Sequence, residues 1–256
     1  MATKQKTPKE STALVTQTEQ AIAEVFGGVD TYQFPTDAPL PRALILRESS
    51  QFEMPGGELT KSFEGHVVYW HEANTYWSNP FGEGGSSFPD CCSSNGAFPD
   101  GGDNRQAESC ANCLHNEYGT DPKGGKGKAC QNSIMLYIVR DGDRLPFILK
   151  APASSLGKRE SLIPWLTNAI NEGYAGKYQT ICVRFGLYKK EFDRYPASIL
   201  KLETVRVLDP GEPDDKTQLD RLAKLFGEVQ RYYRQRGAAD VAQTERDAEA
   251  SNANSL

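Results

Sequence analysis

The stretch that decides the fold runs from residue 134 to residue 150 and reads IMLYIVRDGDRLPFILK. Two apolar runs, Ile134–Arg140 and Leu145–Lys150, flank the polar turn DGD. Runs rich in β-branched and aromatic residues that are joined by a short polar turn are typical of a β-hairpin. We therefore predict a hairpin here, and we place the other elements outward from it.

Four further runs have the composition of strands, which brings the expected total to about six strands. They are Ala43–Arg47, Gly65–His71, Lys177–Tyr188 and Ile199–Leu208. Cys182 lies inside the third of these runs, so we expect it to be a buried core cysteine.

Three segments have the apolar spacing of helices. Thr16–Phe26 ends at a Gly-Gly pair, and Ser154–Glu172 contains Pro164, which should limit or kink it. Asp214–Gly237 has a continuous apolar face. We expect residues 1–15 to be a flexible tail and residues 238–256 to be disordered.

The predicted fold class is therefore mostly β (α+β), with a single domain over residues 16–237. A helix between successive strands is typical of the OB-fold, so the best interpretation is an OB-like barrel with a flanking C-terminal helix. The pattern of cysteines adds a zinc-binding insertion at about residues 88–131 to this prediction.

No run of 18 apolar residues occurs in the 256-residue chain, so we expect no membrane span. The N-terminus lacks the apolar region of a secretory signal. Together these features predict a cytoplasmic protein in a reducing compartment, where metal binding is favoured over disulfides.

The net charge of −5 argues against nucleic acid as a ligand, but the charge is unevenly placed. Residues 104–201 carry a net charge of +6, and the remainder of the chain carries −11. A basic middle between acidic flanks is expected of a binding face with self-masking ends. Ordinary surface charge is the alternative interpretation.

Residues 72–133 have almost no apolar periodicity and contain five of the six cysteines. A long stretch without secondary structure needs another organising element, and a metal ion supplies one. Cys110 and Cys113 form a CxxC pair, with Cys130 on one side and Cys91 or Cys92 on the other. Four thiolates suit one tetrahedral, structural zinc ion.

Cys91 is the preferred fourth ligand, because Pro89-Asp90 sets it at the mouth of a turn. Cys92 and His115 are the rivals. The other interpretations are free thiols or a redox CxxC, although the βαβ context of a redox pair is missing. A catalytic zinc is disfavoured because the chain has three histidines and neither an HExxH nor a deaminase signature. We expect no enzyme activity.

Lys123, Lys126 and Lys128 alternate with glycines and lead directly into Cys130. Glycine lets a backbone approach a phosphate, and each lysine offers a positive charge. A solvated flexible loop is the alternative. The Walker A pattern is absent, so this is not a nucleotide-binding loop of that class.

Aromatic and basic residues are interleaved, a mixture that holds single-stranded nucleic acid through stacked bases and neutralised phosphates. About half of the strand aromatics must face the core, and Tyr137 and Phe185 are expected there. The remaining candidate contacts are Trp70, Trp77, Tyr118, Arg140, Lys150, Arg184 and Lys189.

Three motifs give the sequence a resemblance to a known family. They are PDCCSSNG at residues 89–96, CANCLHN at 110–116 and GKGKAC at 125–130. In this order they resemble bacteriophage zinc-containing OB-fold single-stranded DNA-binding proteins of replication and recombination. The resemblance covers about residues 66–208 and favours Cys91 over Cys92. His115 stands where the family pattern has proline, and Asn95 stands where it has aspartate.

The resemblance implies a non-enzymatic protein that binds single-stranded DNA, carries one structural Zn2+ and works beside replication or recombination proteins. A zinc-stabilised protein-interaction module, such as a phage factor that docks on a host or replisome protein, is the alternative, and net acidity favours it. A nuclease with Asp141, Asp143 and Glu160 as carboxylates is a third hypothesis, but turn and surface roles explain these residues better.

Overall fold

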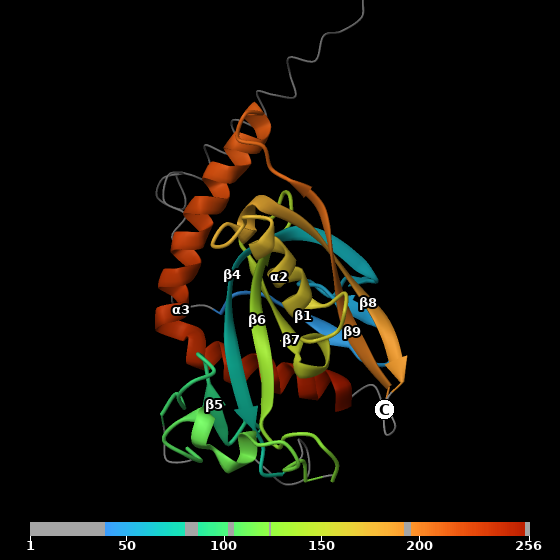
Figure 1. Cartoon of the computed structure of the whole chain (residues 1–256), viewed down its shortest axis with the longest axis vertical. Helices are drawn as coiled ribbons and strands as arrows, with labels where there is room; N and C mark the ends of the chain where they lie inside the picture. Colours follow the sequence, from blue (N-terminus) through green and yellow to red (C-terminus); the bar gives the residue numbers. More distant parts are fainter. Residues whose placement is uncertain (1–38, 80–86, 102–104, 123, 192–195, 254–256) are drawn as a thin grey trace, which may run out of the picture. The chain divides into compact units, whose positions relative to one another are not determined.

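The structure, a computed structural model, is arranged around one long strand, β4 (Ser62–Tyr76). Its 15 residues pair with β8 through the first part, with β6 through the second part, and with β5 at the C-terminal end. The segment SFEGHVVYWHEANTY is rich in β-branched and aromatic residues, which favours so long a strand. Figure 1 shows β4 passing from the main sheet down to β5.

The structure describes residues 39–79, 87–101, 105–122, 124–191 and 196–253, all of which belong to the unit Phe34–Leu256. The tail expected at residues 1–15 and the helix expected at Thr16–Phe26 lie outside the described residues.

The strands form one sheet with the order β3-β2-β1-β7-β6-β4-β8-β9, and β5 pairs with β4 beside this path. All pairings are antiparallel except β1 with β7, which is parallel. The predicted hairpin is confirmed as β6 and β7, and the four other predicted strands correspond to β1, β4, β8 and β9. The remaining bounds are β1 Arg42–Leu46, β2 Gln51–Glu53, β3 Leu59–Thr60, β5 Cys91–Ser93, β6 Gln131–Val139, β7 Phe147–Pro152, β8 Ile181–Glu191 and β9 Pro196–Val207.

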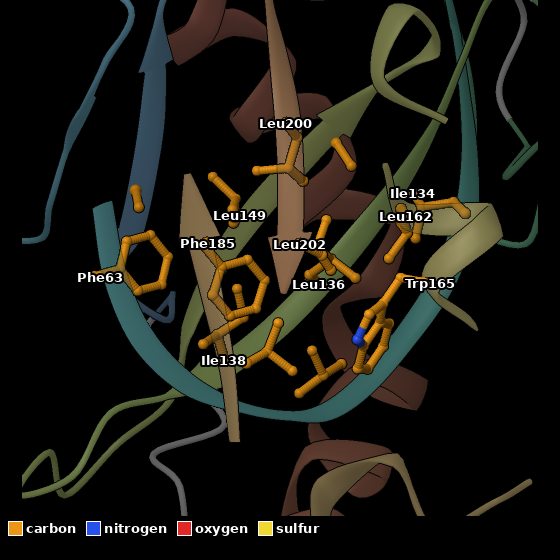
Figure 2. Close-up of a cluster of buried hydrophobic side chains, with 14 of the residues drawn as sticks. Phe63, Ile134, Leu136, Ile138, Leu149, Leu162, Trp165, Phe185, Leu200 and Leu202 are labelled. Carbon is orange, nitrogen blue, oxygen red and sulfur yellow. The ribbon is translucent and has the colours of Figure 1, made fainter. Parts of the chain in front are cut away.

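The sheet is curled into a half-barrel around a large apolar core. Figure 2 shows β4 curving around Phe63, Ile138, Phe185 and their neighbours. Gly65 permits this close curvature, because a Cβ there would lie 2.9 Å from the Val139 carbonyl oxygen. The terminal strand β9 approaches the end of β1 at Ser198, whose hydroxyl donates to the carbonyl of Arg47, just beyond β1, at 2.8 Å.

Helix α2 (Leu162–Asn171) lies between β7 and β8 in the sequence and packs into this core through Leu162, Trp165, Leu166 and Ala169. The prediction of one helix over Ser154–Glu172 is wrong at its N-terminal end. Residues Ala153–Ser155 form a separate 3-10 turn, η3. Pro164 fits the first turn of α2, where its missing N–H needs no partner.

Helix α3 (Pro213–Ala253) covers the other face of the sheet. It changes direction along its length, as Figure 1 shows. The prediction of disorder from residue 238 is wrong as far as Ala253, because the helix continues and buries Val241, Thr244 and Glu245. The predicted domain end at residue 237 is wrong for the same reason. Residues 254–256 lie outside the described residues.

The fold is thus a mixed α and β arrangement with a curled sheet and a C-terminal helix. In the described part of the chain, no helix combines the length and the apolar composition that crossing a membrane requires. The stretch expected to lack secondary structure contains the end of β4, strand β5 and two short 3-10 turns, η1 (Cys110–Asn112) and η2 (Leu114–Asn116).

Candidate metal centre and nucleic-acid interface

The C-terminal end of β4 brings together cysteines from distant parts of the sequence. Tyr76 is paired with Cys91 on β5, while Thr75 is paired with Gln131 on β6, directly after Cys130. Cys110 begins η1, and its amide donates to the Ala97 carbonyl at 2.8 Å. One small cavity is lined by Cys91, Cys92, Cys110, Cys113 and Cys130, together with Tyr76, Asn116 and other neighbours.

The thiols share this cavity without being closed around one point. Among the described residues, no group of three or more Cys, His, Asp or Glu side chains is arranged to hold a metal ion. Burial, together with the nearby Cys110, Cys113 and Cys91, raises the pKa of the Cys130 thiol to about 12. Burial also raises the pKa of Cys91, with Cys110 and Cys113 contributing. A cation at the centre would reverse this effect, because it stabilises thiolates.

Cys91 and Cys92 differ in their surroundings because adjacent strand residues point to opposite faces. Cys92 packs against the core under α3, and burial raises its pKa to about 12. Cys91 instead lies in the electrostatic neighbourhood of Cys110, Cys113 and Cys130. The ring of His115 stacks on Tyr76 at a centroid distance of 4.0 Å, and His115 is not among the residues that line the cysteine cavity.

Three asparagines connect the sheet to the segment that carries the cysteines. Asn132 Nδ2 on β6 donates to Asn74 Oδ1 at 2.6 Å and to Asn116 Oδ1 at 3.0 Å. Asn116 Nδ2 donates to the Cys110 carbonyl, and Asn74 Nδ2 donates to the Gly96 carbonyl. Sequence reasoning placed Asn116 in a motif but missed the network, because its partners come from separate strands.

The motif at residues 89–96 has a local physical basis. Asn95 Oδ1 accepts bonds from the amides of Ala97 and Phe98, both at 2.8 Å. Aspartate offers the same acceptor, so either residue at this position supports the turn. Gly96 has φ +70°, and a Cβ there would lie 2.8 Å from Glu72 Cβ. Only glycine meets both requirements without strain.

The Lys/Gly loop folds back on the segment after η2. The Gly119 amide donates to the Gly127 carbonyl at 2.7 Å, and the Cys130 amide donates to the His115 carbonyl at 2.7 Å. Lys128 Nζ donates to Asn116 Oδ1 at 3.2 Å and lies 4.9 Å from the centroid of the Tyr118 ring. Tyr118 is 82% exposed. Lys126 is exposed, and Lys123 lies outside the described residues.

Several other predicted contacts are engaged with acidic neighbours. Arg140 pairs with Asp143 at 2.9 Å, and Lys150 forms an ion pair with the fully buried Glu245. Arg184 pairs with Glu64 at 2.7 Å and lies 3.9 Å from Glu203. Ion pairing leaves these cations less free to neutralise phosphates than the sequence suggested.

The predicted contacts do not share one surface. Arg184 and Lys189 lie on β8, which pairs with β4 between Ser62 and His66, whereas the cysteines gather at the opposite end of β4. Lys189 is exposed there. Trp70 is half-buried against the main core, and Trp77 is also half-buried, just beyond β4. The structure therefore brings together Tyr118, Lys126 and Lys128 with the cysteines and places Trp77 just beyond the same end of β4, whereas Arg184 and Lys189 lie at the other end.

No protein-family model, curated protein or solved structure matches this chain.

Proposed function

We propose that this chain is a non-enzymatic single-stranded DNA-binding protein with an OB-like barrel and one structural zinc ion. The observation that carries the proposal is the exposed Tyr118 ring with the Lys128 ammonium beside it, on a loop anchored among cysteines. A flat exposed ring can stack on a base of any identity, and a neighbouring lysine can neutralise the adjoining phosphate.

Zinc would be held by Cys91, Cys110, Cys113 and Cys130, which line one cavity. The donor set fits, because four thiolates are typical of closed structural zinc sites. When bound, zinc would favour the thiolate forms and connect the segments that carry these residues. Cys130 adjoins the Lys/Gly loop, so the ion would restrict the loop that carries Lys126 and Lys128.

The OB-like interpretation is supported by the curled sheet and by α2, which lies between β7 and β8 in the sequence and fills the half-barrel with Leu162 and Trp165. OB-folds are partly open barrels that bind oligonucleotides through one face of the sheet and the adjoining loops.

The carboxylates considered for hydrolysis have structural partners, which supports binding rather than catalysis. Asp143 pairs with Arg140, Asp141 accepts a bond from Gln218, and Glu160 lies 3.5 Å from Lys201. They belong to the β6–β7 turn and to the segment before α2, and in the described part of the chain they form no group arranged to hold a metal ion.

Docking on another protein is the second candidate function. The lobe between β5 and β6 exposes Phe98 by 59% and Leu114 by 66%. Exposed apolar side chains on this lobe favour a protein contact, because such side chains anchor interfaces.

Fluorescence anisotropy of a labelled oligo-dT tests the first proposal, with a duplex of the same length as the comparison and several salt concentrations. We expect binding to the single strand that weakens steeply as salt rises, because phosphate contacts release counterions. Equal binding to the duplex, or an affinity that does not change with salt, would contradict the proposal. No binding to either form by zinc-loaded protein would favour protein docking.

A further inference from the structure

Helix α3 has two limbs of different chemistry. Residues 213–237, the apolar limb, bury Leu222, Leu225, Val229 and Tyr232 in the core of the covered sheet face. Residues 238–253, the polar limb, contribute Val241 to that core and otherwise bury Asp240, Thr244 and Glu245. The apolar limb is therefore held by hydrophobic burial, and the polar limb is held mainly by polar contacts.

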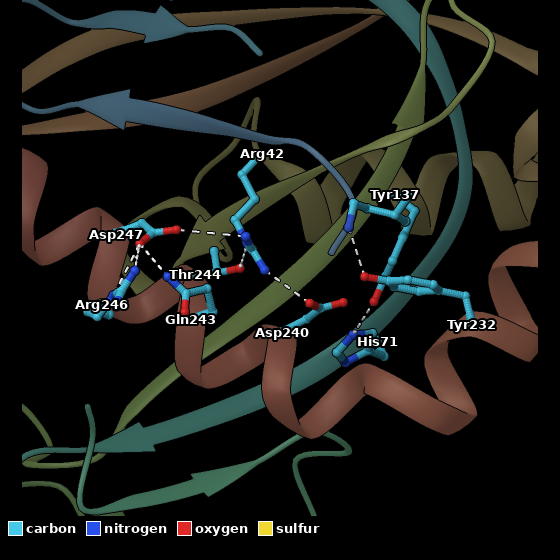
Figure 3. A network of polar contacts seen from close by, with 10 residues as sticks. Arg42, His71, Tyr137, Tyr232, Asp240, Gln243, Thr244, Arg246 and Asp247 are labelled. Carbon is cyan, nitrogen blue, oxygen red and sulfur yellow. Dashed lines mark hydrogen bonds and ion pairs between the residues drawn. The ribbon is translucent and has the colours of Figure 1, made fainter. Parts of the chain in front are cut away.

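The polar limb covers Arg42 of β1, as Figure 3 shows. The Arg42 guanidinium donates to Asp240 Oδ1 at 3.0 Å and to Thr244 Oγ1 at 2.9 Å. It also lies 3.8 Å from Asp247 Oδ2. One side chain of the sheet thus meets three successive positions along one face of the polar limb.

Two further basic side chains near Arg42 also form ion pairs with the polar limb. Lys150 on β7 forms an ion pair with Glu245, and Arg47, just beyond β1, lies 3.2 Å from Glu249. Arg42 is paired with Ile148 across the parallel β1–β7 ladder, so Lys150, two residues further along, points to the same face. Arg42 and Lys150, whose side chains are each 12% exposed, and Arg47, whose side chain is 52% exposed, together form what we call the covered cation strip.

Docking the polar limb on the sheet carries a desolvation cost, because it buries charged side chains. Glu245 is fully buried, and among the described residues its Oε1 atom has no hydrogen-bond partner. Taking paired charges out of water recovers little net free energy, since desolvation offsets much of the attraction. The polar limb therefore has one apolar side chain in this core, Val241, where the apolar limb has four, and ion pairs and hydrogen bonds supply its other contacts.

We propose that the covered cation strip is a second binding site for a single-stranded polynucleotide, and that the polar limb of α3 is its releasable cover. This inference rests on the proposed function. The acidic side chains of the limb occupy the positions that phosphates would take on Arg42, Arg47 and Lys150. A bound strand and the docked limb therefore exclude each other. Only molecules with a released limb can bind a strand at the strip. The apparent affinity of the strip is therefore its intrinsic affinity multiplied by the fraction of molecules in which the limb is released.

The test compares full-length variants in anisotropy titrations with oligo-dT and oligo-rU. Asp240→Asn/Glu245→Gln weakens the limb by removing two acidic charges. Val241→Ala weakens it with every charge left in place. The matched control, Asp220→Asn/Glu172→Gln, removes the same number of acidic charges from exposed positions outside the limb.

If the limb is released in about one wild-type molecule in ten, a variant in which it is fully released binds the oligonucleotide about tenfold more tightly. We expect this gain in both limb variants, whereas the affinity of the control stays within about twofold of the wild-type value. Unchanged affinity in both limb variants, with clear binding by the wild type, overturns this inference and leaves the proposed function standing. Absence of binding by every variant overturns both. Oligo-dT and oligo-rU distinguish DNA from RNA as the source of the phosphates.

Hydrogen exchange of the wild-type protein provides a second measurement that needs no substitution. Amides of residues 238–253 should exchange faster when the protein is saturated with the bound strand, while amides of residues 219–232 keep their protection. Full protection of the polar limb in the saturated complex would overturn the inference.

Discussion

Lys128 Nζ lies 4.9 Å from the centroid of the Tyr118 ring while it donates a hydrogen bond to Asn116 Oδ1 at 3.2 Å. The lysine therefore connects an exposed ring to the asparagine network that joins the loop to β6. This relationship gives the proposed single-strand contact a fixed geometry on an otherwise glycine-rich loop.

Replacing Tyr118 with alanine should weaken oligo-dT binding by about tenfold, since stacking on an aromatic ring contributes about 1–3 kcal/mol for each base. Anisotropy titration at fixed salt measures the change. Phe98→Ala is the matched control, because it removes another exposed ring from the same lobe. Equal losses in both variants would contradict a specific stacking role for Tyr118.

The zinc content of single cysteine-to-serine variants should show which cysteines bind the metal. Cys113→Ser should lose zinc and lower the melting temperature, because a structural zinc site supplies folding free energy. Cys92→Ser and Cys182→Ser should keep about one zinc per chain, since Cys92 packs against an apolar core and Cys182 is buried at the other end of β4, paired with His66. Mass spectrometry under native conditions gives the stoichiometry. Loss of zinc in Cys92→Ser with retention in Cys91→Ser would reverse the assignment of the fourth ligand.

Asn132→Ala should destabilise the protein by about 1–3 kcal/mol, because it removes the donor to Asn74 and Asn116 and leaves the buried Asn74 and the half-buried Asn116 with fewer partners. Urea denaturation measures the free energy of unfolding. Asn112→Ala, at an exposed position in η1, is the control and should change stability by less than about 0.5 kcal/mol. Similar values for the two variants would mean that the asparagine network contributes nothing to stability.

Gly96→Ala should lower the melting temperature of the protein more than Gly101→Ala does. Both glycines have positive φ, so both substitutions introduce the same kind of backbone strain, about 1 kcal/mol. At Gly96 the new Cβ also meets Glu72 Cβ at 2.8 Å, whereas at Gly101 nothing lies within 4 Å. Thermal denaturation of the two variants isolates the cost of the contact. A smaller loss at Gly96 than at Gly101 would contradict the placement of β5 against β4.

Stability should fall as the pH decreases below 6.5, the ordinary pKa of histidine. Burial lowers the pKa of both His66 and His71 in the folded state, so the unfolded chain takes up protons at a higher pH than the folded chain does. The stability contributed by the neutral histidines is therefore fully present above the unfolded pKa and is lost below it, by at most about 1.4 kcal/mol per pH unit for each histidine.

Urea denaturation at several pH values, from about one unit above to about one unit below the ordinary histidine pKa, measures this slope. His71→Gln should reduce the slope, because one of the two buried rings no longer titrates. An unchanged slope in His66→Gln/His71→Gln would assign the pH dependence to other groups.

The sequence predicted the strands well where local composition decides them. The IMLYIVR and LPFILK runs became β6 and β7, since their apolar residues are buried on both faces of a covered sheet. The spacing of the cysteines also predicted that they lie close together. Cys91, Cys110, Cys113 and Cys130 line one cavity in the structure. These features depend on residues that are close in sequence or of a chemically distinctive type.

Other features depend on tertiary contacts that composition cannot reveal. The polar limb of α3 has the composition of a disordered tail, but Asp240 meets Arg42 across 198 residues and Glu245 meets Lys150 across 95 residues. The same contacts remove Lys150 from the exposed cations. Lys189 and Lys126 are both exposed lysines, and only the strand pairing places them at opposite ends of β4.

Photochemical cross-linking of a bromodeoxyuridine-containing single strand to the zinc-loaded wild-type protein tests the central claim most directly, with the cross-linked peptide identified by mass spectrometry. We expect cross-links at Tyr118, and their loss when unlabelled oligo-dT competes. Cross-links confined to peptides of β8 and β9, or a yield no higher than that with duplex DNA, would contradict the claim that the cysteine-anchored loop binds single strands.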